Sequence, residues 1–100
     1  ESLYVQDGAK GIVKSLELNE GNYLYNVGIN KGSSIIEIAE LISKHMDWNG
    51  DFNLNTDMPD GVMRKTVNGD LGGKLLNWKP EVKLNDGIKK TVEWYINNNE

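Results

Sequence analysis

The strongest structural signal in this chain is the stretch Ser34-Ile35-Ile36-Glu37-Ile38-Ala39-Glu40-Leu41-Ile42. Ser34 and Glu37 are spaced as a capping box, in which each side chain accepts a hydrogen bond from the other residue's backbone N–H. Apolar residues then recur at the three- and four-residue spacing of one helix face: Ile35, Ile38, Ala39, Ile42 and Met46. We therefore predict a helix over residues 34–46 that packs this face against a core.

Two more helices are predicted, one before this segment and one near the end of the chain. Asp7 is placed to cap a helix over residues 8–18, because an aspartate side chain accepts backbone N–H groups at a helix start. The apolar positions of that helix are Ala9, Ile12, Val13 and Leu16. A final helix over residues 85–97 is expected to bury Ile88, Thr91, Val92 and Tyr95.

Three short strands are expected between the helices. Residues 23–29 (Tyr-Leu-Tyr-Asn-Val-Gly-Ile) form an apolar, β-favouring run that is typical of a buried strand. Phe52 and Leu54 alternate with polar neighbours, as on a half-buried strand, and residues 63–67 supply a third. Together these elements predict an α+β fold, a small mixed domain of about three helices and three short strands.

Residues 68–76 are the weakest part of this prediction. Gly72 and Gly73 stand at the centre of the segment, and each glycine costs about 1 kcal/mol relative to alanine inside a helix. Two interpretations remain, a frayed helix or a backbone held close to another part of the chain. We expect the frayed helix. Trp78, which follows before Lys79-Pro80, is expected to be a packing anchor.

Composition is that of an ordinary globular protein. The 100 residues suit one domain or a piece of a larger protein, and the start at Glu1 without methionine favours a piece. The absence of cysteine excludes disulfides and fits a reducing cytoplasm. No apolar run approaches the roughly 20 residues of a membrane-spanning helix. His45, the single histidine, cannot anchor a typical zinc site alone, so no metal site is expected.

The formal net charge of −4 argues against a nucleic-acid partner. The charged residues are unevenly distributed along the chain. Residues 1–63 carry 4 basic and 10 acidic side chains, whereas residues 64–100 carry 7 and 5. The cations of the second part can therefore raise the local concentration of an anionic ligand.

These cations begin beside a distinctive turn, Pro59-Asp60-Gly61-Val62-Met63-Arg64-Lys65. Proline presets one dihedral of the turn, aspartate bonds its own backbone, and glycine accepts a positive φ. Arg64 and Lys65 point to opposite sides if the segment is extended, so one of them can enter a given cleft. A cation fixed beside a tight turn can hold a phosphate or a carboxylate. The alternative is a solvated pair on an edge strand.

Several segments in a fixed order resemble a known family. They are Leu3–Asp7, Tyr25–Gly28, Ser34–Ile42, the turn at 59–65, Leu75–Pro80 and Gly87–Tyr95. Over residues 2 to 96 the chain resembles the C-terminal third of extended short-chain dehydrogenase/reductases that act on nucleotide sugars. Within this NAD-dependent epimerase/dehydratase family, Pro59-Asp60-Gly61 followed by Arg64-Lys65 is most similar to the enzymes acting on GDP-4-keto-6-deoxymannose.

The family's catalytic and cofactor-binding motifs do not occur in the chain. Gly8 and Gly11 have the spacing of two glycines of a dinucleotide-binding turn, but Lys14 stands in the place of the third. The catalytic Tyr-x-x-x-Lys motif is absent, because none of the four tyrosines has a lysine four residues later. We therefore expect neither catalytic nor cofactor-binding residues here, with the resemblance implying an NADP-binding Rossmann domain elsewhere in the parent enzyme. These 100 residues alone are expected to be inactive.

The resemblance implies that Lys65 contacts the diphosphate of a nucleotide sugar, with Arg64 in a supporting role. A GDP-sugar is the favoured partner, and dTDP- or UDP-sugars are alternatives. A standalone, non-catalytic binding module is a second class of function. Separation from the Rossmann domain would expose apolar surface of the helix 34–46 or the strand 23–29, so self-association is also expected.

Overall fold

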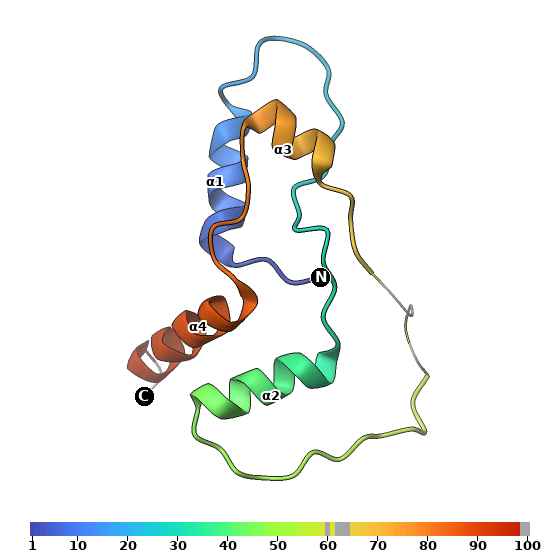
Figure 1. Cartoon of the computed structure of the whole chain (residues 1–100), viewed down its shortest axis with the longest axis vertical. Coiled ribbons are helices and arrows are strands. Elements are labelled where there is room, and N and C mark those ends of the chain that lie inside the picture. The colour runs from blue at the N-terminus through green and yellow to red at the C-terminus, as the bar shows by residue number, and fades with distance from the viewer. Residues whose placement is uncertain (60, 62–64, 99–100) are drawn as a thin grey trace.

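The computed structural model describes residues 1–59, 61 and 65–98. Within them lie four helices, α1 (Val5–Ser15), α2 (Ile35–His45), α3 (Asp70–Leu76) and α4 (Leu84–Asn98). Helices α1 and α3 pack together at one end of an elongated molecule, and α2 and α4 pack at the other (Figure 1). The described residues between α2 and α3 run around the outside of the molecule without forming a helix or a strand, apart from those at the start of α3 (Figure 1).

The predicted α+β class is wrong, since the described residues contain four helices and no strand. The segments 23–29 and 65–67 lie near each other. They do not pair as strands, because the side chain of Glu1, and not the backbone of the other segment, accepts their N–H hydrogen bonds. The Glu1 carboxylate accepts hydrogen bonds from the backbone N–H groups of Ile29 (2.8 Å) and Val67 (2.9 Å). A sheet needs direct N–H to C=O pairing between neighbouring backbones, which this arrangement replaces.

The other parts of the strand prediction have separate outcomes. Phe52 packs against Trp48 with ring centroids 5.4 Å apart, and both side chains remain about half exposed. Local aromatic packing therefore replaces the second predicted strand. Residues 63 and 64 of the third predicted strand lie outside the described residues.

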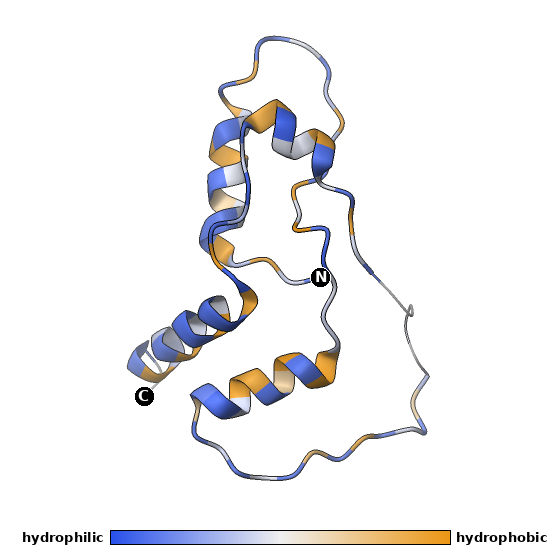
Figure 2. Ribbon diagram, in the orientation of Figure 1, coloured by the Kyte–Doolittle hydropathy of each residue, from blue (hydrophilic) through white to orange (hydrophobic). Residues whose placement is uncertain are grey.

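Helix α2 confirms the capping-box prediction. The Ser34 hydroxyl accepts from the Glu37 N–H at 3.1 Å, and the Glu37 carboxylate accepts from the Ser34 N–H at 3.3 Å. The predicted apolar stripe is only partly covered, because Ile35 is 82% exposed. Figure 2 shows the alternation of hydrophobic and hydrophilic residues along this helix.

Helix α1 differs from its prediction in start and in orientation. It begins at Val5, and the residue at its N-cap is Tyr4, so Asp7 lies within the first turn and does not cap the helix. The buried positions are Asp7 and Gly11. The predicted core stripe is instead exposed to solvent: Ala9, Ile12, Val13 and Leu16. The helix therefore buries the face that carries Asp7 and Gly11, and not the apolar face that the hydrophobic pattern predicts.

Helix α3 contradicts the expectation of a frayed segment at 68–76. Gly72 is buried, and a Cβ placed on it would collide with the backbone carbonyl oxygen of Asn26. Asn77 ends the helix in the left-handed conformation (φ 48°), which asparagine tolerates better than most residues. The close approach of backbone, rather than fraying, explains the glycine at position 72.

Helix α4 confirms the final predicted helix but only half of its predicted buried face, since Val92 is buried and Ile88 half-buried whereas Thr91 and Tyr95 are exposed. The His45 ring at the end of α2 hydrogen-bonds to the Asn85 side chain at 2.9 Å, which connects the two helices. Leu76, Trp78 and Val92 are the buried apolar side chains among the described residues. This core is small for 100 residues.

Candidate functional site

The predicted anion-binding residues have different outcomes. Arg64 and Asp60 lie outside the described residues. Lys65 is exposed, and its backbone carbonyl accepts a hydrogen bond from the Glu1 nitrogen at 2.9 Å. Pro59 and Gly61 are exposed as well. The structure thus leaves the Lys65 side chain accessible while its backbone is held in place.

Glu1 is the residue that positions this segment. Its two carboxylate oxygens bind the N–H groups of Ile29 and Val67, and its own nitrogen binds Lys65 on the same segment as Val67. Hydrogen bonds to an ionised acceptor are stronger than neutral ones. Glu1 therefore fastens the residues that follow the 59–65 turn to the segment at 26–30.

A polar network beside Glu1 extends this attachment to the start of α3. The Asn30 side chain donates to the Asp70 carboxylate at 2.7 Å and accepts a hydrogen bond from the Gly69 N–H. Asn68 accepts from the Asp70 N–H at 3.0 Å. Asn30 has φ 60°, a conformation for which asparagine is enriched. The network fixes the direction in which the chain leaves Lys65 and enters α3.

The sequence analysis missed Glu1 and Asn30. Asn68 supports the same turn, because its side-chain oxygen accepts a hydrogen bond from the Asp70 N–H. A local signal for Asn30 was present, because Asn30-Lys31-Gly32 combines residues that favour turns. Glu1 had no such signal, since its partners lie 28 and 66 residues away.

A shallow groove of about 520 Å³ lies beside this network. Its walls come from the segments 28–30, 69–74 and 77–80, and the lining residues include Lys74, Lys79 and Asp70. The groove therefore has polar and apolar surface in similar amounts, with both cationic and anionic residues along it.

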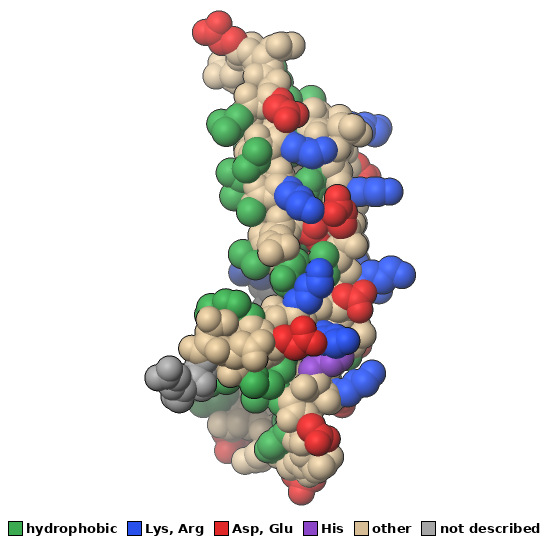
Figure 3. Space-filling model, turned by 90° about the vertical axis from the view of Figure 1, so that its left-hand side faces the viewer, with side chains coloured by type: hydrophobic (Ala, Val, Ile, Leu, Met, Phe, Trp, Pro, Cys, Tyr) green, Lys and Arg blue, Asp and Glu red, His purple; other side chains and the backbone are tan. Residues whose placement is uncertain are grey.

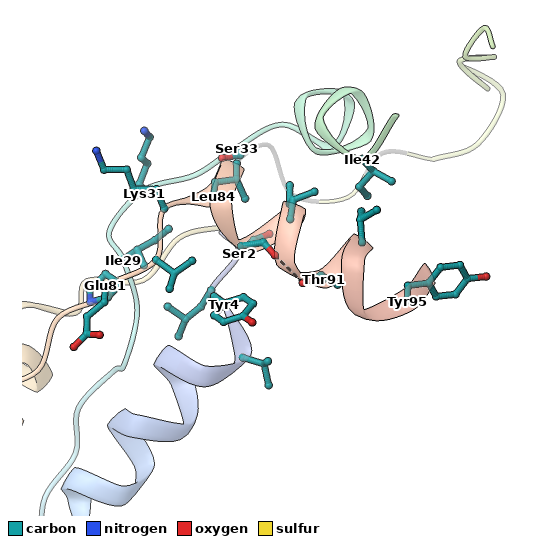
Figure 4. A pocket seen from close by; sticks show the side chains of 18 of the residues that line it. Ser2, Tyr4, Ile29, Lys31, Ser33, Ile42, Glu81, Leu84, Thr91 and Tyr95 are labelled. Carbon is teal, nitrogen blue, oxygen red and sulfur yellow. Dashed lines mark hydrogen bonds between the residues drawn. The ribbon is translucent and has the colours of Figure 1, made fainter. Parts of the chain in front are cut away.

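A larger groove of about 960 Å³ is mainly apolar and lies among α2, α4 and the residues before α1. Figure 4 shows Ile42 of α2 on one side of α4 and Tyr4 on the other. Thr91 contributes no free hydroxyl proton there, because the hydroxyl donates to the Gly87 carbonyl at 2.8 Å. Tyr4 also lies under the Lys90 ammonium, 5.6 Å from the ring centroid, a cation–π contact.

Asp7 and Trp78 hold α1 against the segment that lies between the two grooves. Asp7 is 1% exposed, and its carboxylate accepts from the Val82 N–H at 2.9 Å. The Trp78 indole N–H donates to the Asp7 carbonyl at 3.0 Å. These two bonds join α1 to the segment between α3 and α4, and they confirm Trp78 as a packing anchor.

Gly8 and Gly11 do not form a dinucleotide-binding turn. Gly8 and Gly11 lie inside α1 and not on a turn between a strand and a helix. Gly11 is buried, and a Cβ there would come within 2.9 Å of the Val27 side chain and 3.5 Å of Trp78. The glycine at 11 thus serves packing between α1 and its neighbours.

Metal and membrane sites were searched over the part of the chain that the structure describes. No group of three or more His, Cys, Asp or Glu side chains is placed to hold a metal ion there. None of the helices in this part has the length and apolar character that crossing a bilayer requires.

Comparison with known proteins gives relatives along the whole chain. It is 35% identical over 102 residues to GDP-L-fucose synthase of Azorhizobium caulinodans, covering 100% of this chain and 32% of the relative. It is 34% identical to GDP-L-fucose synthase 1 of Arabidopsis thaliana, covering 98% and 30%. For dTDP-glucose 4,6-dehydratase 1 of Escherichia coli the identity is 27%, covering 96% and 29%. No family model matches.

The chain therefore spans about a third of the length of these relatives.

Proposed function

We propose that this chain is the nucleotide-sugar-binding part of an enzyme of the extended short-chain dehydrogenase/reductase family, related to the GDP-L-fucose synthases that it matches. The observation that carries the proposal is similarity over the full chain to enzymes whose names specify nucleotide sugars. Residues 1–100 form one substrate-binding unit, and the NADP-binding Rossmann domain of the parent enzyme lies outside them.

Lys65 is the residue that we assign to the nucleotide diphosphate, with Arg64 beside it in a supporting role. Two observations support Lys65. Its side chain is exposed, and its backbone is held by Glu1, so the ammonium group extends from a fixed base. The held backbone removes only the backbone part of the entropic cost of binding an anion. A charge-assisted hydrogen bond to a phosphate oxygen contributes about 1.5–3 kcal/mol when sheltered from water.

The intact parent enzyme would use NADPH to epimerise and reduce a GDP-linked 4-keto-6-deoxy sugar. This reaction needs a proton-transferring tyrosine and a hydride donor, and neither has a site in these residues. The chain therefore contributes binding and orientation to the reaction, not its chemical steps. The absence of cysteine fits a cytoplasmic enzyme.

An alternative substrate is favoured by one specific observation. The chain also matches dTDP-glucose 4,6-dehydratases over 96% of its length, so a dTDP- or UDP-sugar would use the same surface. Lys65 contacts the diphosphate in either case, because that group is common to all three ligands. Base specificity therefore has to be measured separately from phosphate binding. A standalone binding module without catalysis is the remaining alternative.

The test is an NMR titration of the 100-residue chain with GDP, UDP and dTDP. We expect GDP to shift the signals of residues 65–69 and 26–30 most strongly. Lys65→Ala should weaken the affinity up to about 5-fold, because an ion pair made by an exposed side chain contributes at most about 1 kcal/mol. Lys89→Ala, which removes an exposed cation from α4, is the matched control and should leave the affinity unchanged.

Three results would contradict parts of the proposal. Equal shifts with all nucleotides would remove the GDP preference but leave diphosphate binding intact. Equal losses in Lys65→Ala and Lys89→Ala would show non-specific attraction to net charge. No shift with any nucleotide would refute binding by this chain alone.

A further inference from the structure

The sequence contains the dipeptide Asn-Gly twice, at Asn49-Gly50 and at Asn68-Gly69. An asparagine before glycine loses its side-chain amide more readily than other asparagines, because glycine has no Cβ to hinder attack by its own backbone nitrogen on the asparagine side chain. The two pairs have the same intrinsic chemistry. A difference in their reactivity therefore has to come from the structure around each pair.

The first pair lies in the segment after α2, and both of its residues are exposed. Among the hydrogen bonds between described residues, none involves the Asn49 side chain or the Gly50 N–H. A Cβ placed on Gly50 would collide with the Trp48 ring, so this contact requires glycine at the position. The backbone nitrogen of Gly50 is thus free to approach the Asn49 side chain without breaking a hydrogen bond between described residues.

The second pair is held through the backbone of Gly69. This residue is buried, and its N–H donates to the Asn30 side-chain oxygen. A Cβ placed on Gly69 would come within 2.7 Å of the Gly28 carbonyl oxygen, so the two backbones are closely packed. The nitrogen that would have to attack is therefore engaged in a hydrogen bond and has little room to move.

The asparagine of the second pair is held as well. The Asn68 side-chain oxygen accepts from the Asp70 N–H at 3.0 Å, and the Asn68 carbonyl accepts from the Asn26 side chain at 3.3 Å. Attack on the side chain would require this arrangement to open. The rate of reaction is then reduced by the small fraction of time that the segment spends open.

We propose that Asn49 is a site of spontaneous deamidation and that Asn30 protects Asn68 from the same reaction. The Gly50 backbone nitrogen attacks Cγ of Asn49 and closes a five-membered succinimide. The bond from Cγ to Nδ2 breaks, and the amide leaves as ammonia together with the proton of the Gly50 N–H. Water then opens the succinimide at either carbonyl and gives aspartate or isoaspartate, so water is the one co-reactant.

The product carries one more negative charge beside Asp47 and Asp51. Figure 3 shows acidic side chains at the lower end of the molecule, where α2 and the segment after it lie in Figure 1. Isoaspartate also leads the backbone through the side chain and lengthens it between Trp48 and Phe52, whose rings are 5.4 Å apart. The inference goes beyond nucleotide binding, because neither pair includes Lys65.

Mass spectrometry of the folded chain measures both reactions in one sample. The chain is incubated at mildly alkaline pH and digested, and the amide and carboxylate forms of each peptide are quantified over time. Asn49 should convert at least about tenfold faster than Asn68, since a local opening free energy of only about 1.4 kcal/mol gives this ratio. The same chain unfolded in guanidinium chloride is the control, and the two rates should become similar there.

Asn30→Gly tests the protection of the second pair. Glycine accepts the φ of 60° at this position, so the variant removes the acceptor of the Gly69 N–H and keeps the backbone conformation. Deamidation at Asn68 should become roughly 2- to 10-fold faster, as expected for the loss of one hydrogen bond. The rate at Asn49 should not change. Asn19→Gly, at an exposed asparagine outside both pairs, is the matched control and should change neither rate.

Three results would overturn the inference. Equal rates at the two asparagines of the folded chain would show that the structure does not distinguish them. A difference that persists in guanidinium chloride would assign it to the flanking sequence and not to the fold. An unchanged rate at Asn68 in Asn30→Gly, with native far-UV circular dichroism, would remove the protective role of Asn30.

Discussion

The glycine at position 72 offers a direct test of the packing between α3 and the segment at 23–29. In Gly72→Ala, the added Cβ would collide with the Asn26 carbonyl oxygen, and the Tyr25 ring lies 3.2 Å away. The ring is held in place because the Tyr25 hydroxyl donates to the Ser15 hydroxyl at 2.7 Å, and Asn26 is held by its side-chain hydrogen bond to the Asn68 carbonyl at 3.3 Å. The backbone of α3 must therefore shift to admit the methyl group.

The expected magnitude is a balance of two terms. Alanine improves the helix by up to about 1 kcal/mol relative to glycine. Overpacking against a fixed neighbour costs about 1–3 kcal/mol, and a backbone obstacle belongs at the upper end of this range. Gly72→Ala should therefore lower the free energy of unfolding by about 1–2 kcal/mol. For a chain of this length that is a fall in Tm of about 4–16 °C.

Gly8→Ala is the matched control, since Gly8 is also helical and an added Cβ there would meet only the Leu3 side chain at 3.5 Å. This variant should gain about 0.4–1 kcal/mol. Both variants are measured by urea and thermal denaturation with circular dichroism, at one low protein concentration so that association contributes equally. If Gly72→Ala stabilises the chain as much as Gly8→Ala does, then α3 is not packed on Asn26 and the reasoning fails.

Two further substitutions test the other supports of the fold. Asp7→Ala leaves the Val82 N–H without its buried acceptor and should lower the free energy of unfolding in urea by about 3 kcal/mol. Glu40→Ala, at an exposed carboxylate of α2, is the control and should lower it little. Equal losses in the two variants would contradict the role of Asp7. Ser34→Ala removes one side of the capping box and should lower stability by about 1 kcal/mol, with Ser33→Ala as the neighbouring control. An unchanged stability of Ser34→Ala would mean that the box contributes nothing.

The candidate site around Lys65 could be predicted only in part from the sequence. Lys65 was identified from a turn and a family resemblance, and the structure places its side chain on the surface. Its attachment through Glu1, Asn30 and Asp70 was not predictable, because those hydrogen bonds join residues about 30 to 70 positions apart. Nothing in the local pattern of an isolated Glu1 or Asn30 reveals such partners.

The similarity to the GDP-L-fucose synthases was determined by the sequence, because ordered motifs spread over the whole chain are a property of the sequence itself. Helices α2 and α4 were determined in the same way. The capping box at Ser34 and the apolar spacing of both segments act through residues three and four positions apart, so a local reading includes every group that matters.

Only the tertiary structure decided which face of α1 is buried, whether 23–29 pairs as a strand, and why Gly72 stands inside a helix. In each case the deciding partner is distant in sequence: Val82 and Trp78 for Asp7, Glu1 for Ile29, and Asn26 for Gly72. A buried carboxylate must keep its hydrogen bonds, and a backbone carbonyl leaves no room for a methyl group. Those two requirements outweigh the free energy gained by burying the apolar residues of α1, so these residues face solvent.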